Sequence, residues 1–170
     1  YHPTAPSPDG SGGIRSMKLS LNNAKIKTEE IEYINAHGTS TPLGDEIEFN
    51  AVKKLFNHNL DKIFMSSTKS STGHLLGASG AIEAIFSIKT IQDGIIPPTL
   101  NLEKISKDCH GINLVPNESI DKKVNIANAT VKQLLDLGKK GTVAPSAAAC
   151  QSSASSVPLN PPVRTASAEE

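Results

Sequence analysis

The chain has 170 residues, and its seventeen basic and seventeen acidic side chains give a formal net charge of zero. This balance, with 4% aromatic residues and no tryptophan, argues against a nucleic-acid-binding protein, which needs a basic surface or aromatic rings for base stacking. No apolar run approaches the ~20 residues that span a bilayer, so we expect no membrane span. The length predicts one domain with a modest core.

The two cysteines, Cys109 and Cys150, lie far apart in unlike surroundings. They support neither a disulfide framework nor a CxxC metal site, which favours a reducing compartment. The sequence begins at Tyr1 without a methionine or a signal peptide, so we expect a fragment or a processed product.

The first elements follow from hydrophobic spacing. After a Pro- and Gly-rich loop over residues 1–13, apolar residues at i, i+3 and i+7 predict an amphipathic helix, followed by a strand over residues 31–36. A second helix is predicted from Gly44-Asp45 to about residue 55, and a short strand over residues 63–66. The apolar residues expected on the buried faces of these two helices are Ile14, Met17, Leu21, Ile47, Ala51, Val52 and Leu55.

A third helix is predicted over residues 75–92, with apolar side chains around nearly its whole circumference. A helix of this kind is typically buried on all sides, which requires more cover than 170 residues readily supply. Residues 112–115 and 124–127 predict two further strands, and residues 131–140 a short helix. Residues 143–170 are rich in Ala, Ser and Pro, which predicts a disordered tail.

Two segments share one order of features: a strand ends, a His-Gly or Gly-His pair follows with hydroxyl side chains around it, and a helix begins. His37 lies in the first segment and His74 in the second, with Lys69 just before it. A neutral imidazole can donate an N–H to a developing oxyanion, and an ammonium held by a carboxylate can orient it. The pattern therefore predicts one site that stabilises an enolate or a tetrahedral intermediate. Hydroxyls suited to a polar, uncharged substrate arm are those of Thr39, Thr41, Thr68, Ser70 and Thr72.

Other interpretations remain open at this point. A histidine near a helix start is often structural, and Ser or Thr before a helix is an ordinary cap. A zinc site built on His37 and His74 lacks further ligands at a suitable spacing, and the segment before His74 lacks the Gly and Lys placement of a P-loop. His58 and His110 lie in polar turns and are expected on the surface.

The segments Asn35–Asp45 and Ser67–Gly77 resemble the two histidine motifs of the beta-ketoacyl-acyl-carrier-protein synthases. The similarity is to the elongating, free-standing type (synthase II) of bacteria and organelles more than to polyketide synthase modules. It begins at Tyr1, passes through Pro97–Leu102 and runs to about Ala127. Two long motifs in this order make the resemblance specific.

The resemblance implies an α/β fold: the C-terminal half of a thiolase-like α-β-α-β-α architecture, incomplete in this chain. The helix over residues 75–92 would belong to the central layer. We therefore expect a partial C-terminal ketoacyl-synthase domain over residues 1–131. Residues 132–170 resemble nothing in the family and are expected to form a divergent, disordered tail.

The resemblance also implies roles for individual residues. His37 and His74 would bind the malonyl thioester and stabilise the enolate formed when carbon dioxide leaves. Lys69 would organise the site together with Glu83 and Asp45. Thr39 and Thr41 would contact the pantetheine arm. The implied protein has no metal and no cofactor of its own, because 4'-phosphopantetheine arrives on the acyl carrier protein.

The implied partners are the acyl carrier protein with its malonyl or acyl thioester, a second copy as in the family's homodimer, and the missing N-terminal half. Nucleic acid and membrane are not expected as partners. The implied location is the cytoplasm of a bacterium or an organelle.

Besides the divergent tail, two further features depart from the family pattern. The nucleophilic cysteine belongs to the absent N-terminal half, and Cys109 matches an ordinary loop. The C-terminal Asn-Ser-Phe-Gly-Phe-Gly-Gly-Thr-Asn stretch is also missing after Ala127. We therefore expect a fragment of a 3-oxoacyl-ACP synthase that is inactive in condensation by itself. Two alternatives are a residual malonyl-thioester decarboxylase and a non-catalytic, partner-binding subunit or relic.

Overall fold

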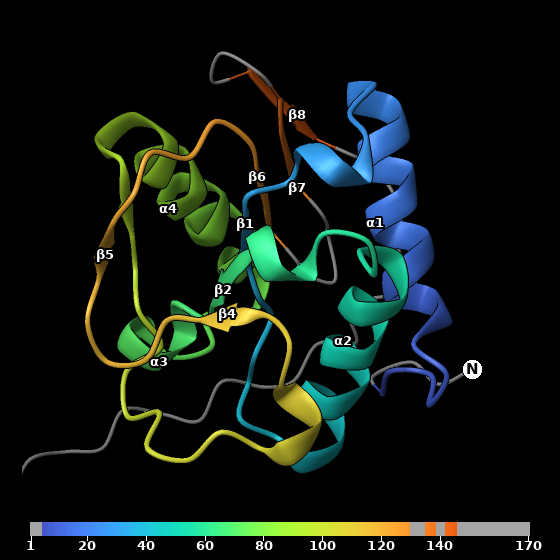
Figure 1. Ribbon diagram of the computed structural model, residues 1–170, viewed down its shortest axis with the longest axis vertical. Coiled ribbons are helices and arrows are strands. Elements are labelled where there is room, and N and C mark those ends of the chain that lie inside the picture. The colour runs from blue at the N-terminus through green and yellow to red at the C-terminus, as the bar shows by residue number, and fades with distance from the viewer. Residues whose placement is uncertain (1–4, 130–134, 139–141, 146–170) are drawn as a thin grey trace, which may run out of the picture.

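A six-stranded mixed sheet forms the centre of the computed structural model, which describes residues 5–129, 135–138 and 142–145 (Figure 1). The strand order is β4-β2-β1-β6-β7-β8, with β3 and β5 pairing separately as an antiparallel ribbon. Strands β4, β2, β1 and β6 run parallel, whereas β7 and β8 are antiparallel to their neighbours. The strands are β1 Tyr33–Asn35, β2 Phe64–Ser66, β3 Ile95–Ile96, β4 Asn113–Leu114, β5 Ile120–Asp121, β6 Ala127–Ala129, β7 Leu135–Gly138 and β8 Thr142–Pro145.

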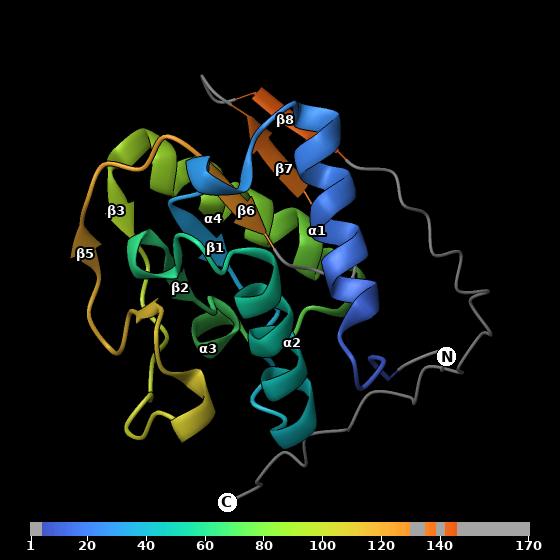
Figure 2. The ribbon, with the colours of Figure 1, turned by 45° about the vertical axis from the view of Figure 1, so that its right-hand side comes forward.

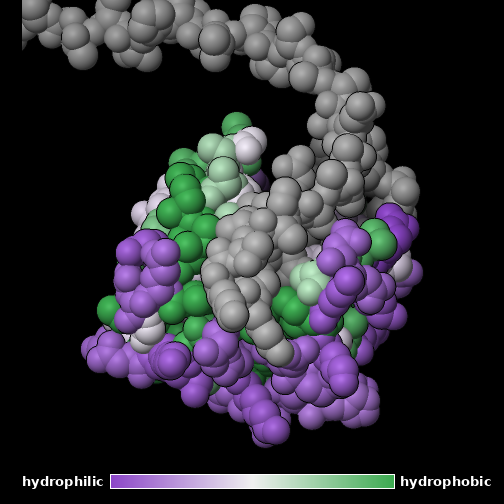
Figure 3. Space-filling model, turned by 90° about the horizontal axis from the view of Figure 1, so that it is seen from above, coloured by the Kyte–Doolittle hydropathy of each residue, from purple (hydrophilic) through white to green (hydrophobic). Residues whose placement is uncertain are grey.

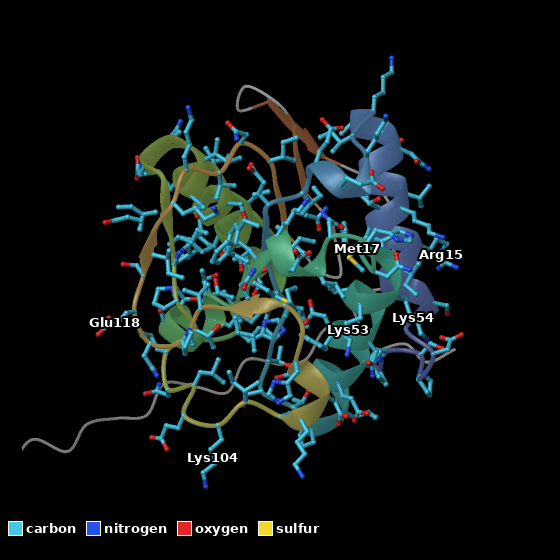
Figure 4. All side chains as sticks on the ribbon, in the orientation of Figure 1. Arg15, Met17, Lys53, Lys54, Lys104 and Glu118 are labelled. Atoms are coloured by element: carbon cyan, nitrogen blue, oxygen red, sulfur yellow. The ribbon has the colours of Figure 1, made fainter. Side chains whose placement is uncertain are left out.

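Helices cover both faces of this sheet (Figure 2). On one face, α1 and α2 pack over Ile34 and Met65; on the other, α4 packs over Tyr33 and Ala127. Figure 4 shows Met17 pointing from α1 toward the sheet and Arg15 on the outside of the same helix. The helices are α1 Ser11–Ala24, α2 Pro42–Leu55, α3 Lys69–Thr72 and α4 Ser79–Asp93, with 3-10 turns η1 Thr28–Glu30, η2 Leu60–Lys62, η3 Leu76–Ala78 and η4 Lys107–Cys109.

The predicted elements of the first 70 residues are present. Met17 and Leu21 are buried on α1, and Ile47, Ala51 and Val52 are buried on α2. The second helix begins two residues earlier than predicted, because Pro42 fits the first helical position, where no N–H partner is needed. All three residues of β1 are buried, because helices cover both faces of the parallel strands.

The third predicted helix was expected to need more cover than this chain supplies, and α4 is indeed buried on one side only. The buried stripe of α4 consists of Ser79, Glu83, Ala84, Ser87 and Thr90. Ile85, on the outer side, is 53% exposed, because the sheet covers only one side of α4. Hydrophobic residues accordingly gather on the α4 side of the surface in Figure 3.

The short helix predicted over residues 131–140 is also wrong. Residues 135–138 form β7, which continues the sheet from β6, and residues 142–145 form β8. The free edge of β6 offers backbone partners, and Leu-Asp-Leu alternates as a strand requires. The predicted disordered tail is thus replaced by strand at residues 143–145, and residues 146–170 lie outside the described part of the chain.

In the described part of the chain, none of the helices combines the length and the apolar character that crossing a membrane requires.

Candidate active site

The two histidine segments leave the sheet at the same edge. Asn35 at the end of β1 is in register with Ser66 at the end of β2, and the two strands are parallel. The chain continues to His37 two residues beyond the first position and to Thr68 two residues beyond the second. The carboxyl ends of adjacent parallel strands are the usual place for a site in a sheet of this kind.

Hydrogen bonds join the two segments directly. The Asn35 amide nitrogen donates to the Thr68 hydroxyl (3.2 Å), and the Ser67 hydroxyl donates to the Gly38 carbonyl (2.8 Å). Gly38 has a φ of 32°, and a Cβ there would lie 2.7 Å from the Ser67 Cβ. Only glycine fits this close approach.

Glu48 on α2 fixes the backbone at His37. Its carboxylate accepts the N–H of His37 through Oε1 and the N–H of Gly38 through Oε2, both at 2.8 Å. These charge-assisted bonds are stronger than neutral ones. The sequence analysis missed this residue, because the only available signal was a carboxylate eleven positions along the chain on the following helix.

His74 is held through its side chain. The Leu76 N–H donates to His74 Nδ1 (3.1 Å), and the Ser79 hydroxyl oxygen lies 3.0 Å from the same nitrogen. An accepting Nδ1 places the proton of the neutral ring on Nε2. Leu76 itself has a φ of 50°, which is costly for leucine, and it is 79% exposed.

The two imidazole rings lie close together, as predicted. Their ring centroids are 5.2 Å apart and the planes are nearly perpendicular, at 89°. His37 is half-buried and His74 is exposed. His58 and His110 are both exposed, as predicted.

A buried ion pair lies behind the histidines. Lys69, at the start of α3, donates its ammonium to the Glu83 carboxylate on α4, and both side chains are at most 5% exposed. Burial raises the pKa of Glu83, and the Lys69 contact opposes that rise. The predicted proximity of Lys69 and Glu83 is therefore present, and it connects the elements on either side of the His74 segment.

Asp45 lies in the first turn of α2, and its carboxylate faces the backbone of the loop after His37 rather than the ion pair. Burial raises its pKa, while backbone N–H groups of Thr41, Ser40 and Thr39 and, more weakly, the Lys69 charge lower it. The hydroxyls of Thr39 and Thr41 lie 3.3 Å apart. Lys69 thus acts on Asp45 through space, and the loop holds its carboxylate.

An open cleft of about 350 Å³ adjoins this loop without including the histidines. It is lined by Ser40, Thr41, Pro42, Asp45, Glu46, Phe49, Ser106, Asp108 and Cys109. Burial, with a smaller effect of the Asp108 charge, raises the pKa of the Cys109 thiol, which disfavours the nucleophilic thiolate. Cys150 lies outside the described residues.

Two imidazole rings 5.2 Å apart, one of them with its proton held on Nε2, can donate N–H groups to a carbonyl oxygen that gains negative charge. Within residues 5–129, 135–138 and 142–145, no cluster of three or more His, Cys, Asp or Glu side chains is placed to hold a metal ion.

Residues 1–103 match the family described as "Beta-ketoacyl synthase, C-terminal domain". Among curated proteins, the chain is 50% identical over 127 residues to "3-oxoacyl-[acyl-carrier-protein] synthase 2" of Rhizobium meliloti and 47% identical over 125 residues to the enzyme of the same name from Coxiella burnetii. These alignments cover 75% and 74% of this chain but 30% of each relative. The chain therefore matches about 30% of the length of these relatives.

Solved structures show the same similarity. One is a ketosynthase complex of a type II PKS with its acyl-carrier protein, bound to the hexaketide (TM-score 0.71, 31% identity, covering 84% of this chain and 34% of that chain). Another is a beta-ketoacyl synthase from Burkholderia phymatum (TM-score 0.68, 32% identity, covering 84% and 32%). The α/β layers described above are thus part of a thiolase-like ketosynthase fold.

Proposed function

The chain belongs to the beta-ketoacyl synthase family, and from this premise we propose that it is the C-terminal part of a 3-oxoacyl-ACP synthase of fatty acid elongation. The whole enzyme would condense malonyl-ACP with an acyl group held on a cysteine of its other part. A cytoplasmic or organellar location is part of this proposal. The similarity to synthase 2 enzymes at 46–50% identity supports it.

His37 and His74 would stabilise the enolate that forms when the malonyl group loses carbon dioxide. The observation that carries this proposal is the 5.2 Å ring pair at the ends of two parallel strands. His74 has its Nδ1 engaged by an N–H donor, so its Nε2–H is available for the thioester oxygen.

The other site residues would position the substrate and the imidazoles. The Lys69–Glu83 pair would hold the start of α3 against α4, and Asp45 would hold the loop that carries Thr39 and Thr41. Those two hydroxyls would contact the pantetheine arm. No cofactor resident in the chain is then needed, because the 4'-phosphopantetheine arrives on the acyl carrier protein.

Decarboxylation tests the histidine roles without requiring a nucleophile. The chain would be incubated with malonyl-ACP carrying a labelled carboxyl group, and released carbon dioxide would be counted. We expect His37→Ala and His74→Ala each to lower the rate about 10²-fold, as for loss of an oxyanion donor. His110→Ala, an exposed loop variant, is the control. Equal rates in all four proteins would refute the proposed roles.

These 170 residues by themselves would not condense acyl chains. Cys109 is the only cysteine among the described residues, and its raised pKa disfavours a thiolate. Loss of covalent catalysis removes most of the rate of a two-step acyl transfer. A chain that elongates radiolabelled acyl groups from malonyl-ACP without any added polypeptide would contradict this statement.

A second candidate function is that of a partner-binding subunit. The exposed side of α4 supports it. Ile85 on α4 is 53% exposed, and Leu76 in η3, two residues after His74, is 79% exposed. One related ketosynthase was solved in complex with its chain length factor and another with its acyl-carrier protein. Co-expression with the first two-thirds of the Rhizobium meliloti relative tests this. A stable complex that Ile85→Glu disrupts would favour it, and no complex would contradict it.

A further inference from the structure

The segment over residues 97–102, here called the strap, is joined to the turn between β2 and α3 by two hydroxyl groups. The Thr99 hydroxyl accepts the N–H of Ser67 (2.9 Å), and the Ser70 hydroxyl accepts the N–H of Leu100 (2.8 Å). Ser70 donates its own proton to the Ser67 carbonyl (2.8 Å). Both backbone groups of Ser67 are therefore bonded by hydroxyls that belong to the strap or contact it.

Thr99 is itself held firmly from the other side. Its backbone N–H donates to the carbonyl of the buried Val115 (2.7 Å), and its carbonyl accepts the N–H of Asn117 (3.0 Å). A threonine side chain is also stiff, because two heavy atoms on its Cβ restrict rotation. The Thr99 hydroxyl is thus a fixed acceptor on a fixed backbone.

Ser67 connects the strap to the loop that carries His37. It is 6% exposed, and its hydroxyl donates to the carbonyl of Gly38, the residue after His37 (2.8 Å). The direction of each bond is unambiguous, because an N–H can only donate and a carbonyl can only accept. Glu48 holds the N–H groups of this loop from the α2 side, so Ser67 supplies the contact from the β2 side. Two successive bonds therefore lead from Thr99 to the His37 loop.

We propose that Thr99 is a positioning residue for His37: by accepting the Ser67 N–H it sets where Ser67 lies, and Ser67 in turn holds the Gly38 carbonyl. The two segments are close-packed at this point, since a Cβ on Gly38 would lie 2.7 Å from the Ser67 Cβ. A small shift of Ser67 is therefore transmitted to the His37 loop. The effect on catalysis rests on the proposed function, whereas the effect on the loop can be measured without any activity.

The decisive variant is Thr99→Val, which removes the acceptor and keeps the shape of the side chain. Its new methyl group would lie 2.9 Å from the Ser67 nitrogen, whereas carbon atoms pack at about 3.5 Å or more, so Ser67 must shift. If this variant does not fold, Thr99→Ala removes the same acceptor without a clash. Thr99→Ser keeps the acceptor. Thr90→Val is the matched control, because the buried Thr90 hydroxyl has no hydrogen-bond partner among the described residues.

Amide hydrogen exchange, followed by NMR on the 15N-labelled chain, measures each step. The amide of Leu21, buried on α1, is the reference for global opening. Thr99→Val should accelerate exchange at Ser67 and Gly38 about fivefold more than at the reference, as loss of one hydrogen bond implies. Thr99→Ser should restore both rates, and Thr90→Val should leave them unchanged. Faster exchange at Ser67 with no change at Gly38 overturns the proposal. Equal acceleration at Leu21 also overturns it, because only global stability would then have changed.

The decarboxylation assay tests the consequence for His37. Thr99→Val should lower kcat by up to about fivefold and leave KM unchanged, because a misplaced imidazole weakens contacts to the enolate more than substrate binding. Thr99→Ser should recover kcat. An active wild type with an equal kcat in Thr99→Val overturns the proposal. Faster exchange at Gly38 in Thr99→Val, with no carbon dioxide released by the wild type, would confirm that Thr99 holds the loop and would refute the proposed function.

Discussion

His37 and His74 lie in segments that look alike in the sequence but are held by different means. The backbone at His37 is fixed by the Glu48 carboxylate, and its segment is joined to the next one through Gly38 and Ser67. His74 lies in an exposed turn, and its ring is held by Leu76 and Ser79.

The difference shows how much of each segment this chain can specify alone. The start of the His37 segment, at His37 and Gly38, is held by α2 and by Ser67 after β2, whereas Leu43 further along is 60% exposed. The His74 segment has the buried Lys69–Glu83 pair on its inner side, while Leu75 and Leu76 remain 41% and 79% exposed. We therefore expect the first segment to depend on local hydrogen bonds and the second on the ion pair.

The largest effect should come from Lys69→Met. This variant leaves the Glu83 carboxylate buried without its counter-charge, which costs about 3–5 kcal/mol of unfolding free energy. Urea unfolding followed by circular dichroism measures it. The matched control is the double variant Lys69→Met with Glu83→Leu, which should recover most of the loss. A single variant as stable as the wild type would mean that the pair does not anchor the His74 segment.

Glu48→Gln should cost about 3 kcal/mol. The glutamine side chain retains one acceptor and presents an N–H₂ to a backbone N–H, so one charge-assisted bond is lost and a half-buried donor is left unpaired. Glu46→Gln, at an exposed position of the same helix, is the control and should change little. Amide hydrogen exchange at His37 and Gly38 should accelerate in Glu48→Gln alone. Equal exchange in both variants would contradict the role of Glu48.

Gly38→Ala and Gly77→Ala compare the packing of the two segments. The added methyl group at position 38 meets Ser67 at a positive φ, which should cost about 2 kcal/mol. At position 77 a Cβ has no neighbour within 4 Å among the described residues, so the second variant should be within about 0.5 kcal/mol of the wild type. Thermal unfolding of both proteins checks this. A larger loss of stability in Gly77→Ala than in Gly38→Ala would show that the His74 segment is the more tightly packed of the two.

The smallest effect concerns pH and Asp45. Because burial raises its pKa above the ordinary 3.8, the folded chain holds this proton more tightly than the unfolded chain. The stability that Asp45 contributes is therefore full below its unfolded pKa and declines as the pH rises through its folded pKa. Relative to the wild type, Asp45→Asn should gain less than about 1 kcal/mol between about pH 3 and pH 6.

Urea midpoints across that pH range measure this gain, and Asp61→Asn, an exposed variant in η2, is the control. A relative stability of Asp45→Asn that falls with pH would show the opposite sign and contradict the effect of burial.

Periodicity was enough to predict the elements around the site. The i, i+3, i+7 spacing of apolar residues predicted α1, and the alternation of apolar and polar residues predicted β1. The shared order of strand, histidine, hydroxyls and helix predicted that His37 and His74 lie in one site. Each of these depends on residues close in sequence. The contact between Lys69 and Glu83 was expected from the family resemblance and is present, but it followed from no spacing rule.

The remainder depends on long-range packing. Nothing local shows that Glu48 reaches back to the His37 backbone, or that Ser79 bonds a ring rather than its own helix. The apolar circumference of α4 predicted a helix that needs cover on all sides, but it could not show which side this chain covers. Leu134, Leu135 and Leu137 suggested a helix, whereas the open edge of β6 favoured a strand at β7.

The sheet order also bears on the sequence in which the site assembles. Tyr33 of β1 pairs with Phe64 of β2 on one side and with Ala127 of β6 on the other, about three times as far along the chain. Closing the longer loop costs about 1 kcal/mol more in chain entropy, and distant pairings form more slowly. A chain emerging from the ribosome can therefore join β1, α2 and β2, and bring the His37 loop to Lys69, before β6 has been synthesised.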